Sequence, residues 1–183
     1  ANAVAFILQH SEAKVILVEQ QFSNVVSEAI EIADIPIMVV DIADIEGGKD
    51  EVIGSIEYED FLSTGESSIE VRYPDDEWDA IALNYTSGTT GDPKGVVYHH
   101  RGAYLNAMGQ VFNAELVGSN PVYLWTLPLF HCNGWCYAWA LAAVGGTHIC
   151  LRKVAADDIF SAIKQYDVTH FCCAPTVLSF LID

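Results

Sequence analysis

Positive charge is scarce in this 183-residue chain. Its 8 lysines and arginines stand against 25 aspartates and glutamates, so the formal net charge is −17. This excess of negative charge argues against nucleic acids and anionic membranes as partners, because both would be repelled. Long hydrophobic runs are missing too. The longest unbroken run, Trp135 to Val144, is far shorter than the ~18 residues needed to cross a bilayer, so we expect no membrane span.

Disulfide and metal motifs are also lacking. The five cysteines form no C-x-x-C pair, and they lie in apolar stretches where a free thiol behaves as a small buried hydrophobe. This usage is typical of a reducing compartment, and we predict a cytoplasmic protein. No histidines have the H-x-x-x-H or H-E-x-x-H spacing of zinc ligands, so we expect no structural metal bound by the protein.

One segment of the chain is dense in glycine and hydroxyl residues. Tyr85 to Gly95 reads Y-T-S-G-T-T-G-D-P-K-G and follows an apolar run that predicts a buried strand. Glycines let the backbone come close to a ligand, and N–H groups, hydroxyls and the compact charge of Lys94 together suit a polyphosphate. Between Tyr73 and Leu151 the only cations are Lys94 and Arg101. The composition therefore favours a phosphate-binding loop over a plain turn.

The spacing within this loop excludes two common phosphate motifs. A Walker A loop needs a second glycine where Pro93 stands, a Ser or Thr after Lys94, and then a helix. Here Val96 to Tyr98 predicts a strand instead, so we expect the loop to join two strands as a hairpin. The kinase pattern G-x-G-x-x-G is absent as well.

The loop resembles the signature loop of the adenylate-forming superfamily, which includes acyl-CoA synthetases, luciferases and the adenylation domains of peptide synthetases. Asp76 to Asn84 (D-E-W-D-A-I-A-L-N) and Trp125 to Trp135 (W-T-L-P-L-F-H-C-N-G-W) are similar to motifs of the acyl-CoA synthetase branch. Within that branch the chain resembles medium-chain fatty acyl-CoA synthetases, plant acyl-activating enzymes and methylmercaptopropionyl-CoA ligases. The resemblance implies that residues 1–183 are part of the large N-terminal, AMP-binding domain, with the loop at 85–95 and the C-terminal domain absent.

The resemblance also implies a reaction. A carboxylate attacks the α-phosphorus of ATP, and the resulting acyl-adenylate passes its fatty or other small acyl group to CoA. Fixed donors would stabilise the charge that builds up on the leaving phosphates, and Lys94 and Thr89 are the expected catalytic residues. The residues expected to bind ATP are Thr86, Ser87, Gly88, Thr89, Thr90, Gly91 and Lys94.

Other parts of the family's site are missing from the chain. The magnesium-binding glutamate, the adenine-stacking aromatic, the ribose-binding aspartate and the C-terminal lysine of the family belong to motifs that this sequence lacks. The complete enzyme would use ATP, Mg²⁺ and CoA. We expect the chain alone to bind none of them firmly and to be inactive.

The second motif supplies candidate residues for binding the carboxylic acid. His131, Asn133, Gly134 and Trp135 follow a predicted strand, and the resemblance places these residues beside the acyl group. His131 is expected to line the pocket rather than act as a general base, because the acid is already ionised at neutral pH. Trp135 fits a core position as well as a pocket wall, and both interpretations remain open.

Apolar runs that predict strands alternate with segments of helical periodicity. We expect helices over 3–9, 22–33, 58–62, 102–117, 134–144 and 157–166, and strands over 15–18, 36–41, 80–83, 96–98, 122–126, 147–151 and 169–173. This order predicts an α/β fold with a mostly parallel sheet, helices on both faces and one core. The histidines that follow the second hairpin strand, His99 and His100, are expected to cap the next helix.

Two alternatives to a CoA ligase remain open on sequence grounds. The adenylated acyl group could go to a carrier-protein thiol or another acceptor. The chain could also be a remnant that folds without turning over substrate.

Overall fold

The computed structural model describes residues 1–44, 47, 51–86 and 93–182. The chain divides into two compact units, the first formed by Ala1–Tyr73 with Tyr85–Gly95 and the second by Pro74–Asn84 with Val96–Asp183. We expected one core, but each unit has its own. Seventy-odd residues of alternating helix and strand at the start of the chain bury a separate set of side chains.

The first unit is a small parallel sheet with two helices packed on each other. Its elements are α1 (Asn2–His10), β1 (Val15–Glu19), η1 (Gln20–Phe22), α2 (Ser23–Ala33), β2 (Met38–Ile42), β3 (Ile56–Glu57) and α3 (Tyr58–Ser63). The strands pair in the order β1-β2-β3, and both pairings are parallel. On α2, Val26, Ala29 and Ala33 recur at helical spacing and are buried. Ala29 and Ala33 form one cluster with Ala5 and Leu8 of α1.

The second unit is a parallel sheet between helices. Its elements after the hairpin are α4 (His100–Asn113), β6 (Val122–Trp125), α5 (Cys132–Trp135), α6 (Tyr137–Val144), β7 (Thr147–Cys150), α7 (Ala156–Tyr166), β8 (His170–Cys172) and α8 (Pro175–Ile182). Strand β6 is central, and it pairs in parallel with β7 on one side and β8 on the other. This matches the predicted α/β class, although the parallel strands form two sheets rather than one.

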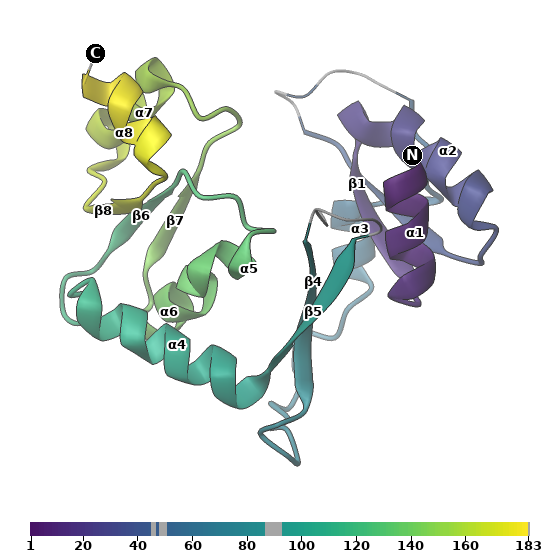
Figure 1. Ribbon diagram of the computed structural model, residues 1–183, viewed down its shortest axis with the longest axis horizontal. Coiled ribbons are helices and arrows are strands. Elements are labelled where there is room, and N and C mark those ends of the chain that lie inside the picture. Colours follow the sequence, from purple (N-terminus) through teal and green to yellow (C-terminus); the bar gives the residue numbers. More distant parts are fainter. Residues whose placement is uncertain (45–46, 48–50, 87–92, 183) are drawn as a thin grey trace. The chain divides into compact units, whose positions relative to one another are not determined.

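Successive side chains of β6 point to opposite faces of the sheet, and helices pack on both faces. Tyr123 and Trp125 pack with α4 and α6, whereas the intervening Leu124 packs with Ile159 of α7 and Val177 of α8. All three β6 side chains are buried. Figure 1 shows α4 and α6 near one another and α7 beside α8 in this unit. The expected arrangement of helices on both faces is therefore confirmed for this sheet.

The hairpin strands are β4 (Ala80–Thr86) and β5 (Lys94–His99), and they form a two-stranded sheet. The prediction that residues 80–83 form a buried strand is wrong in one respect. Ile81 and Leu83 are 40% and 38% exposed, and among the described residues β4 pairs with β5 alone.

The segment 134–144 was predicted as one helix, but it is broken. Helix α5 ends at Trp135 and α6 begins at Tyr137, with Trp135 and Cys136 at φ 56° and 63°. Positive φ cannot continue a right-handed helix. The sequence does not reveal such a break, because the run from Trp135 to Val144 is apolar throughout and has no polar residue to mark where one helix ends and the next begins.

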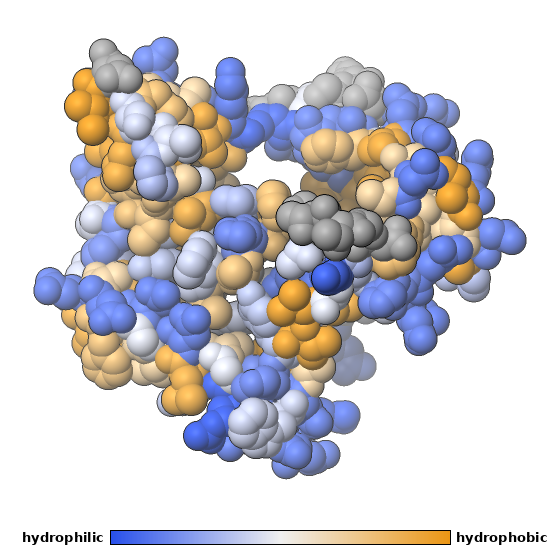
Figure 2. Space-filling model, viewed as in Figure 1, coloured by the Kyte–Doolittle hydropathy of each residue, from blue (hydrophilic) through white to orange (hydrophobic). Residues whose placement is uncertain are grey.

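Large apolar side chains also reach the surface, and orange patches mark apolar residues on the face drawn in Figure 2. Phe130 and Phe112 are 79% and 70% exposed. No helix in the described part of the chain is long and apolar enough to cross a membrane.

Candidate active site

The two ends of the predicted phosphate loop lie on paired strands. Strand β4 ends at Thr86 and β5 begins at Lys94, and both side chains are exposed. A connection this short joins antiparallel strands, so the hydroxyl and the ammonium stand at neighbouring strand ends. Among the described residues no ion pair engages Lys94. The remaining predicted ATP ligands lie outside the described residues: Ser87, Gly88, Thr89, Thr90 and Gly91.

Within the first unit, a histidine of α1 contacts Tyr85, the first residue of the predicted loop. Nδ1 of His10 lies 2.8 Å from the hydroxyl of Tyr85, and the two rings meet edge to face at 5.7 Å. The Phe6 ring also stacks on the His10 ring, with centroids 5.3 Å apart. Sequence reasoning did not find this contact, since nothing in the local pattern links residues so far apart in the chain.

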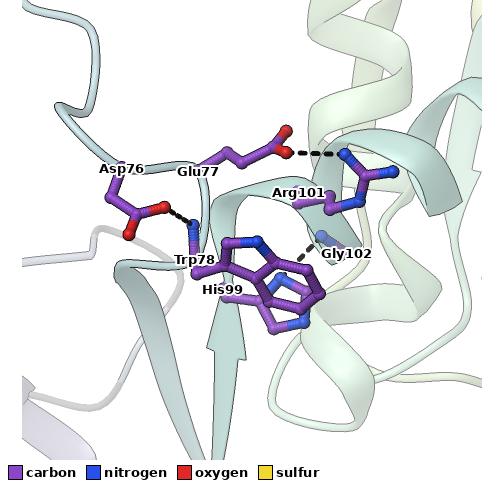
Figure 3. A network of polar contacts seen from close by, with 6 residues as sticks. All are labelled: Asp76, Glu77, Trp78, His99, Arg101 and Gly102. Atoms are coloured by element: carbon purple, nitrogen blue, oxygen red, sulfur yellow. Dashed lines mark hydrogen bonds and ion pairs between the residues drawn. The ribbon is translucent and has the colours of Figure 1, made fainter.

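In the second unit, hydrogen bonds and an ion pair connect the ends of the hairpin that lie away from the loop to the start of α4. The N–H of Gly102 donates to Nδ1 of His99 over 2.9 Å, so His99 caps the helix as predicted. The backbone N–H of Arg101 donates to the carbonyl of Glu77 over 2.8 Å, and their side chains form an ion pair at 2.6 Å. Figure 3 shows these residues together.

Trp78 lies at the centre of this network. Its ring is 4.7 Å from the His99 ring, and the Arg101 guanidinium lies 5.9 Å from its centroid. Asp76 accepts a hydrogen bond from the Trp78 N–H over 2.9 Å. An exposed cation–π contact contributes about 0.5–1 kcal/mol and an exposed ion pair about 0–1 kcal/mol. Together with the cap, they hold the segment before β4 against α4.

The acyl candidates gather between β6 and α6 in the second unit. His131 lies in the turn directly before α5, and its ring meets that of Trp135 edge to face at 6.1 Å. Trp135 is 48% exposed, so the pocket-wall interpretation fits it better than the core interpretation. The side chain of Asn133, the remaining acyl candidate before Gly134, lies outside the described part of the structure.

Gly134 is in contact with the core rather than open space. It is buried at φ 58°, and an added Cβ would lie 2.4 Å from the Trp125 ring and 3.3 Å from Leu129. Glycine is therefore needed here for both its backbone conformation and its size. A larger residue here would have to displace Trp125 or shift α5, the segment that carries Trp135.

Replacing Gly134 by alanine is expected to lower the free energy of unfolding by about 2–4 kcal/mol, from the combined cost of overpacking and of a strained positive φ. Urea denaturation of the purified chain measures this. Gly109→Ala is the matched control, because an added Cβ there meets nothing within 4 Å and the residue lies inside α4. That change is expected to stabilise by up to about 1 kcal/mol. Equal stability of the two variants would contradict the assigned role.

Two cavities flank this segment. The larger, of about 570 Å³, is lined by His131, Trp135 and Tyr137 and by residues 172–175. The smaller, of about 280 Å³, is lined by β5, the first turns of α4, and Cys132, Trp135 and Cys136. Small-molecule sites typically occupy about 300–1,000 Å³. The larger cavity is therefore the better candidate for a carboxylic acid.

Neutral polar groups lie beside the larger cavity. The Cys172 thiol donates to the Tyr137 hydroxyl over 3.2 Å. Burial raises the pKa of Tyr137, and its contact with Cys172 acts in the same direction, so the phenol stays neutral at physiological pH. The nearby Tyr123 hydroxyl is buried and has no hydrogen-bond partner among the described residues. These groups suit an uncharged part of a ligand.

The cysteines are free thiols: Cys132, Cys136, Cys150, Cys172 and Cys173. Burial raises the pKa of Cys136, Cys150 and Cys173, which keeps these side chains protonated. Within the described ranges, no group of three or more His, Cys, Asp or Glu side chains is placed to hold a metal ion.

Comparison with known proteins decides the family. The model of the AMP-binding enzymes matches residues 1–183. The chain belongs to the AMP-binding enzyme family. The resemblance to adenylate-forming enzymes is thereby confirmed.

Curated members of the AMP-binding enzyme family match the whole chain. It is 46% identical to the peroxisomal acetate/butyrate–CoA ligase AAE7 of Arabidopsis thaliana over 198 residues, covering 100% of the chain and 34% of the relative. It is 45% identical to acetate–CoA ligase CCL3 of Humulus lupulus and 40% identical to the peroxisomal trans-cinnamate:CoA ligase of Petunia hybrida, covering 34% of each. The chain thus spans about a third of the length of these AMP-binding relatives.

Solved structures share the fold. The luciferase-like enzyme of the mealworm Zophobas morio matches with a TM-score of 0.77 at 18% identity, over 100% of the chain and 41% of that protein. The o-succinylbenzoate CoA synthetase of Bacillus subtilis in complex with AMP matches with a TM-score of 0.61 at 20% identity, over 99% of the chain and 55% of that protein.

The predicted cytoplasmic location is wrong. Several of the related AMP-binding enzymes, at 40–46% identity, are named as peroxisomal. Free cysteines argue against an oxidising compartment, but they do not distinguish one reducing compartment from another. Peroxisomal addresses are short signals read by receptors, which composition does not reveal.

Proposed function

We propose that this chain is part of the N-terminal domain of a carboxylate–CoA ligase that makes an acyl-adenylate from ATP and a small carboxylic acid. The observation that carries the proposal is its 40–46% identity, over nearly its whole length, to enzymes named as CoA ligases for acetate, butyrate and cinnamate. Since the chain spans a third of these relatives, the activity is proposed for the complete enzyme.

The first step is attack of a carboxylate oxygen on the α-phosphorus of ATP. The bond from the α-phosphorus to the bridging oxygen breaks, and pyrophosphate leaves with the negative charge. Thr86 and Lys94 at the hairpin ends would donate to that charge, together with Ser87, Gly88, Thr89, Thr90 and Gly91 of the loop. This donor set fits a polyphosphate, because it combines a hydroxyl and an exposed ammonium beside a glycine-rich backbone.

Mg²⁺, when bound, would neutralise charge on the phosphate oxygens. The described residues contain no carboxylate cluster to hold it. The residues of this chain would instead hold the phosphates and keep them aligned for in-line displacement.

In the second unit, the larger cavity would receive the acid. His131, Trp135 and Tyr137 give it aromatic walls, as is usual for an apolar ligand with a few polar contacts. His131 would act there through position, since the acid arrives already ionised. In the second step the CoA thiol attacks the adenylate carbonyl, AMP leaves, and a thioester forms.

A thioester assay of the complete enzyme tests this function. With ATP, Mg²⁺ and CoA, a panel of short and medium-chain acids is expected to give acyl-CoA and AMP in equal amounts, best with small acids. Pyrophosphate release without thioester would point to another acceptor, such as a carrier protein. Absence of pyrophosphate release with every acid would favour a non-catalytic remnant.

A further inference from the structure

The hairpin that carries the predicted phosphate loop has little support of its own. Among the described residues, β4 and β5 pair only with each other. A sheet of two strands is marginally stable by itself, so its loop end needs contacts from elsewhere in the protein to keep one position. A site that stabilises charge depends on such support, because donors that must reorganise stabilise a transition state less than donors already in place.

Helix α1 supplies a contact of this kind at the loop end of β4, and both partners belong to the first unit. Nδ1 of His10 lies 2.8 Å from the Tyr85 hydroxyl, and the two rings meet edge to face with centroids 5.7 Å apart. An edge-to-face pair of aromatic rings adds to the stabilisation that the hydrogen bond provides. Two interactions with one side chain, 75 positions away in the sequence, therefore hold Tyr85.

His10 is in turn held in place by its own helix. Phe6 lies one turn earlier on the same face of α1, and its ring stacks on the His10 ring at an angle of 20°. Next to His10, Nε2 of Gln9 donates to the carbonyl of Ala33 over 2.7 Å, which connects the end of α1 to the end of α2. The imidazole is thus presented to the hairpin by a helix that is anchored within the first unit.

Strand geometry determines what this contact does for the residue that follows Tyr85. Successive side chains of a strand point to opposite faces, so Thr86 faces away from the side on which Tyr85 meets His10. Tyr85 is half-buried, whereas Thr86 is exposed. Thr86 is also the last residue of β4 and an expected phosphate donor. An anchored tyrosine is therefore followed directly by a hydroxyl that is free to meet a ligand.

We propose that His10 is a positioning residue for the first step of the reaction. It holds Tyr85, and through Tyr85 it keeps the Thr86 hydroxyl directed at the leaving phosphates. This rests on the proposed function and adds to it a residue of α1 that is remote in sequence from both motifs. His10 touches neither ATP nor the acid, and it lowers the barrier by keeping a donor in one orientation.

Variants of the complete enzyme test the hydrogen bond. His10→Ala removes the imidazole, and Tyr85→Phe removes only the hydroxyl. Each is expected to lower kcat for carboxylate-dependent pyrophosphate release about three- to tenfold, the effect of losing one hydrogen bond, with the KM of the acid unchanged. The double variant is expected to be no slower than the slower single variant, because the same interaction is lost in all three. His10→Asn is expected to recover much of the rate, since its amide can donate or accept near the position of Nδ1.

Gln9→Ala is the matched control for this series. It removes a hydrogen bond from the same end of α1, but the partner of that bond is Ala33 of α2 and not a residue of the hairpin. The control is expected to keep the kcat of the parent. If Gln9→Ala were as slow as His10→Ala, the histidine would act only through the packing of α1, and the inference would be overturned. Additive losses in the double variant would overturn it too.

Hydrogen exchange separates this inference from the proposed function. Exchange of the backbone amides of residues 85 and 86 is followed by mass spectrometry in the complete enzyme without ligands. His10→Ala and Tyr85→Phe are expected to speed this exchange about three- to tenfold, and Gln9→Ala is expected to leave it unchanged. If the parent releases no pyrophosphate with any acid, the proposed function fails, yet exchange still decides whether His10 holds this strand end. Unchanged exchange in both variants would overturn the inference, as would a parent-like kcat in His10→Ala.

Discussion

Replacement of Lys94 by methionine in the complete enzyme is expected to slow carboxylate-dependent pyrophosphate release about 10²–10³-fold, the usual cost of losing a fixed donor from a charge-stabilising site. Methionine keeps much of the length of the side chain and removes the ammonium. Because Lys94 is exposed at the start of β5 and makes no ion pair among the described residues, folding should be little affected. Stopped-time pyrophosphate assays at saturating ATP and acid measure the loss.

Lys164→Met is the matched control for this experiment. Lys164 is also exposed, but it lies in the last turn of α7 in the second unit and belongs to neither the predicted loop nor the acyl motif. The control is expected to retain the parent rate. A Lys94→Met enzyme that releases pyrophosphate as fast as Lys164→Met would remove Lys94 from the site and weaken the assignment of the loop.

The 183-residue chain tested alone is expected to show no carboxylate-dependent pyrophosphate release. The hairpin offers Thr86 and Lys94 to phosphates, but the resemblance places the adenine and ribose contacts in motifs outside this sequence. Without them the α-phosphorus is not held for attack, and correct positioning can account for ~7–11 kcal/mol of such a barrier. A purified sample is compared with its Lys94→Met variant, so that trace contaminants are not counted as activity. Turnover above that variant would mean that the outside motifs are dispensable.

Local chemistry was sufficient to predict most elements and one of their caps. Helix α7 follows from its apolar spacing, with Asp157 and Asp158 in its first turn and Lys164 in its last, where each charge complements the helix dipole. His99 as the cap of α4 follows from its place between a strand and a helix. The parallel β6 and β8 follow from strands separated by helices.

Features that depend on distant contacts could not be predicted. The break between α5 and α6 lies at Trp135 and Cys136, which have positive φ, and a pattern of apolar residues does not encode that backbone conformation. His10 contacts Tyr85, and Trp78 contacts Arg101, only once the chain has folded, because the residues of each pair are far apart in the sequence. The cavity of about 570 Å³ beside His131 and Trp135 is also lined by residues 172–175, so the sequence indicated some of its residues but not the cavity itself.

The central claim is that the enzyme forms an acyl-adenylate, and its most direct test follows the transfer of oxygen from the acid to AMP. The complete enzyme is given ATP, CoA and a small acid whose carboxylate carries heavy oxygen, and the AMP is analysed by mass spectrometry. If a carboxylate oxygen attacks the α-phosphorus, one heavy oxygen appears in each AMP released as the thioester forms. AMP without label, or label in inorganic phosphate formed together with ADP, would contradict an acyl-adenylate and with it the function proposed for this chain.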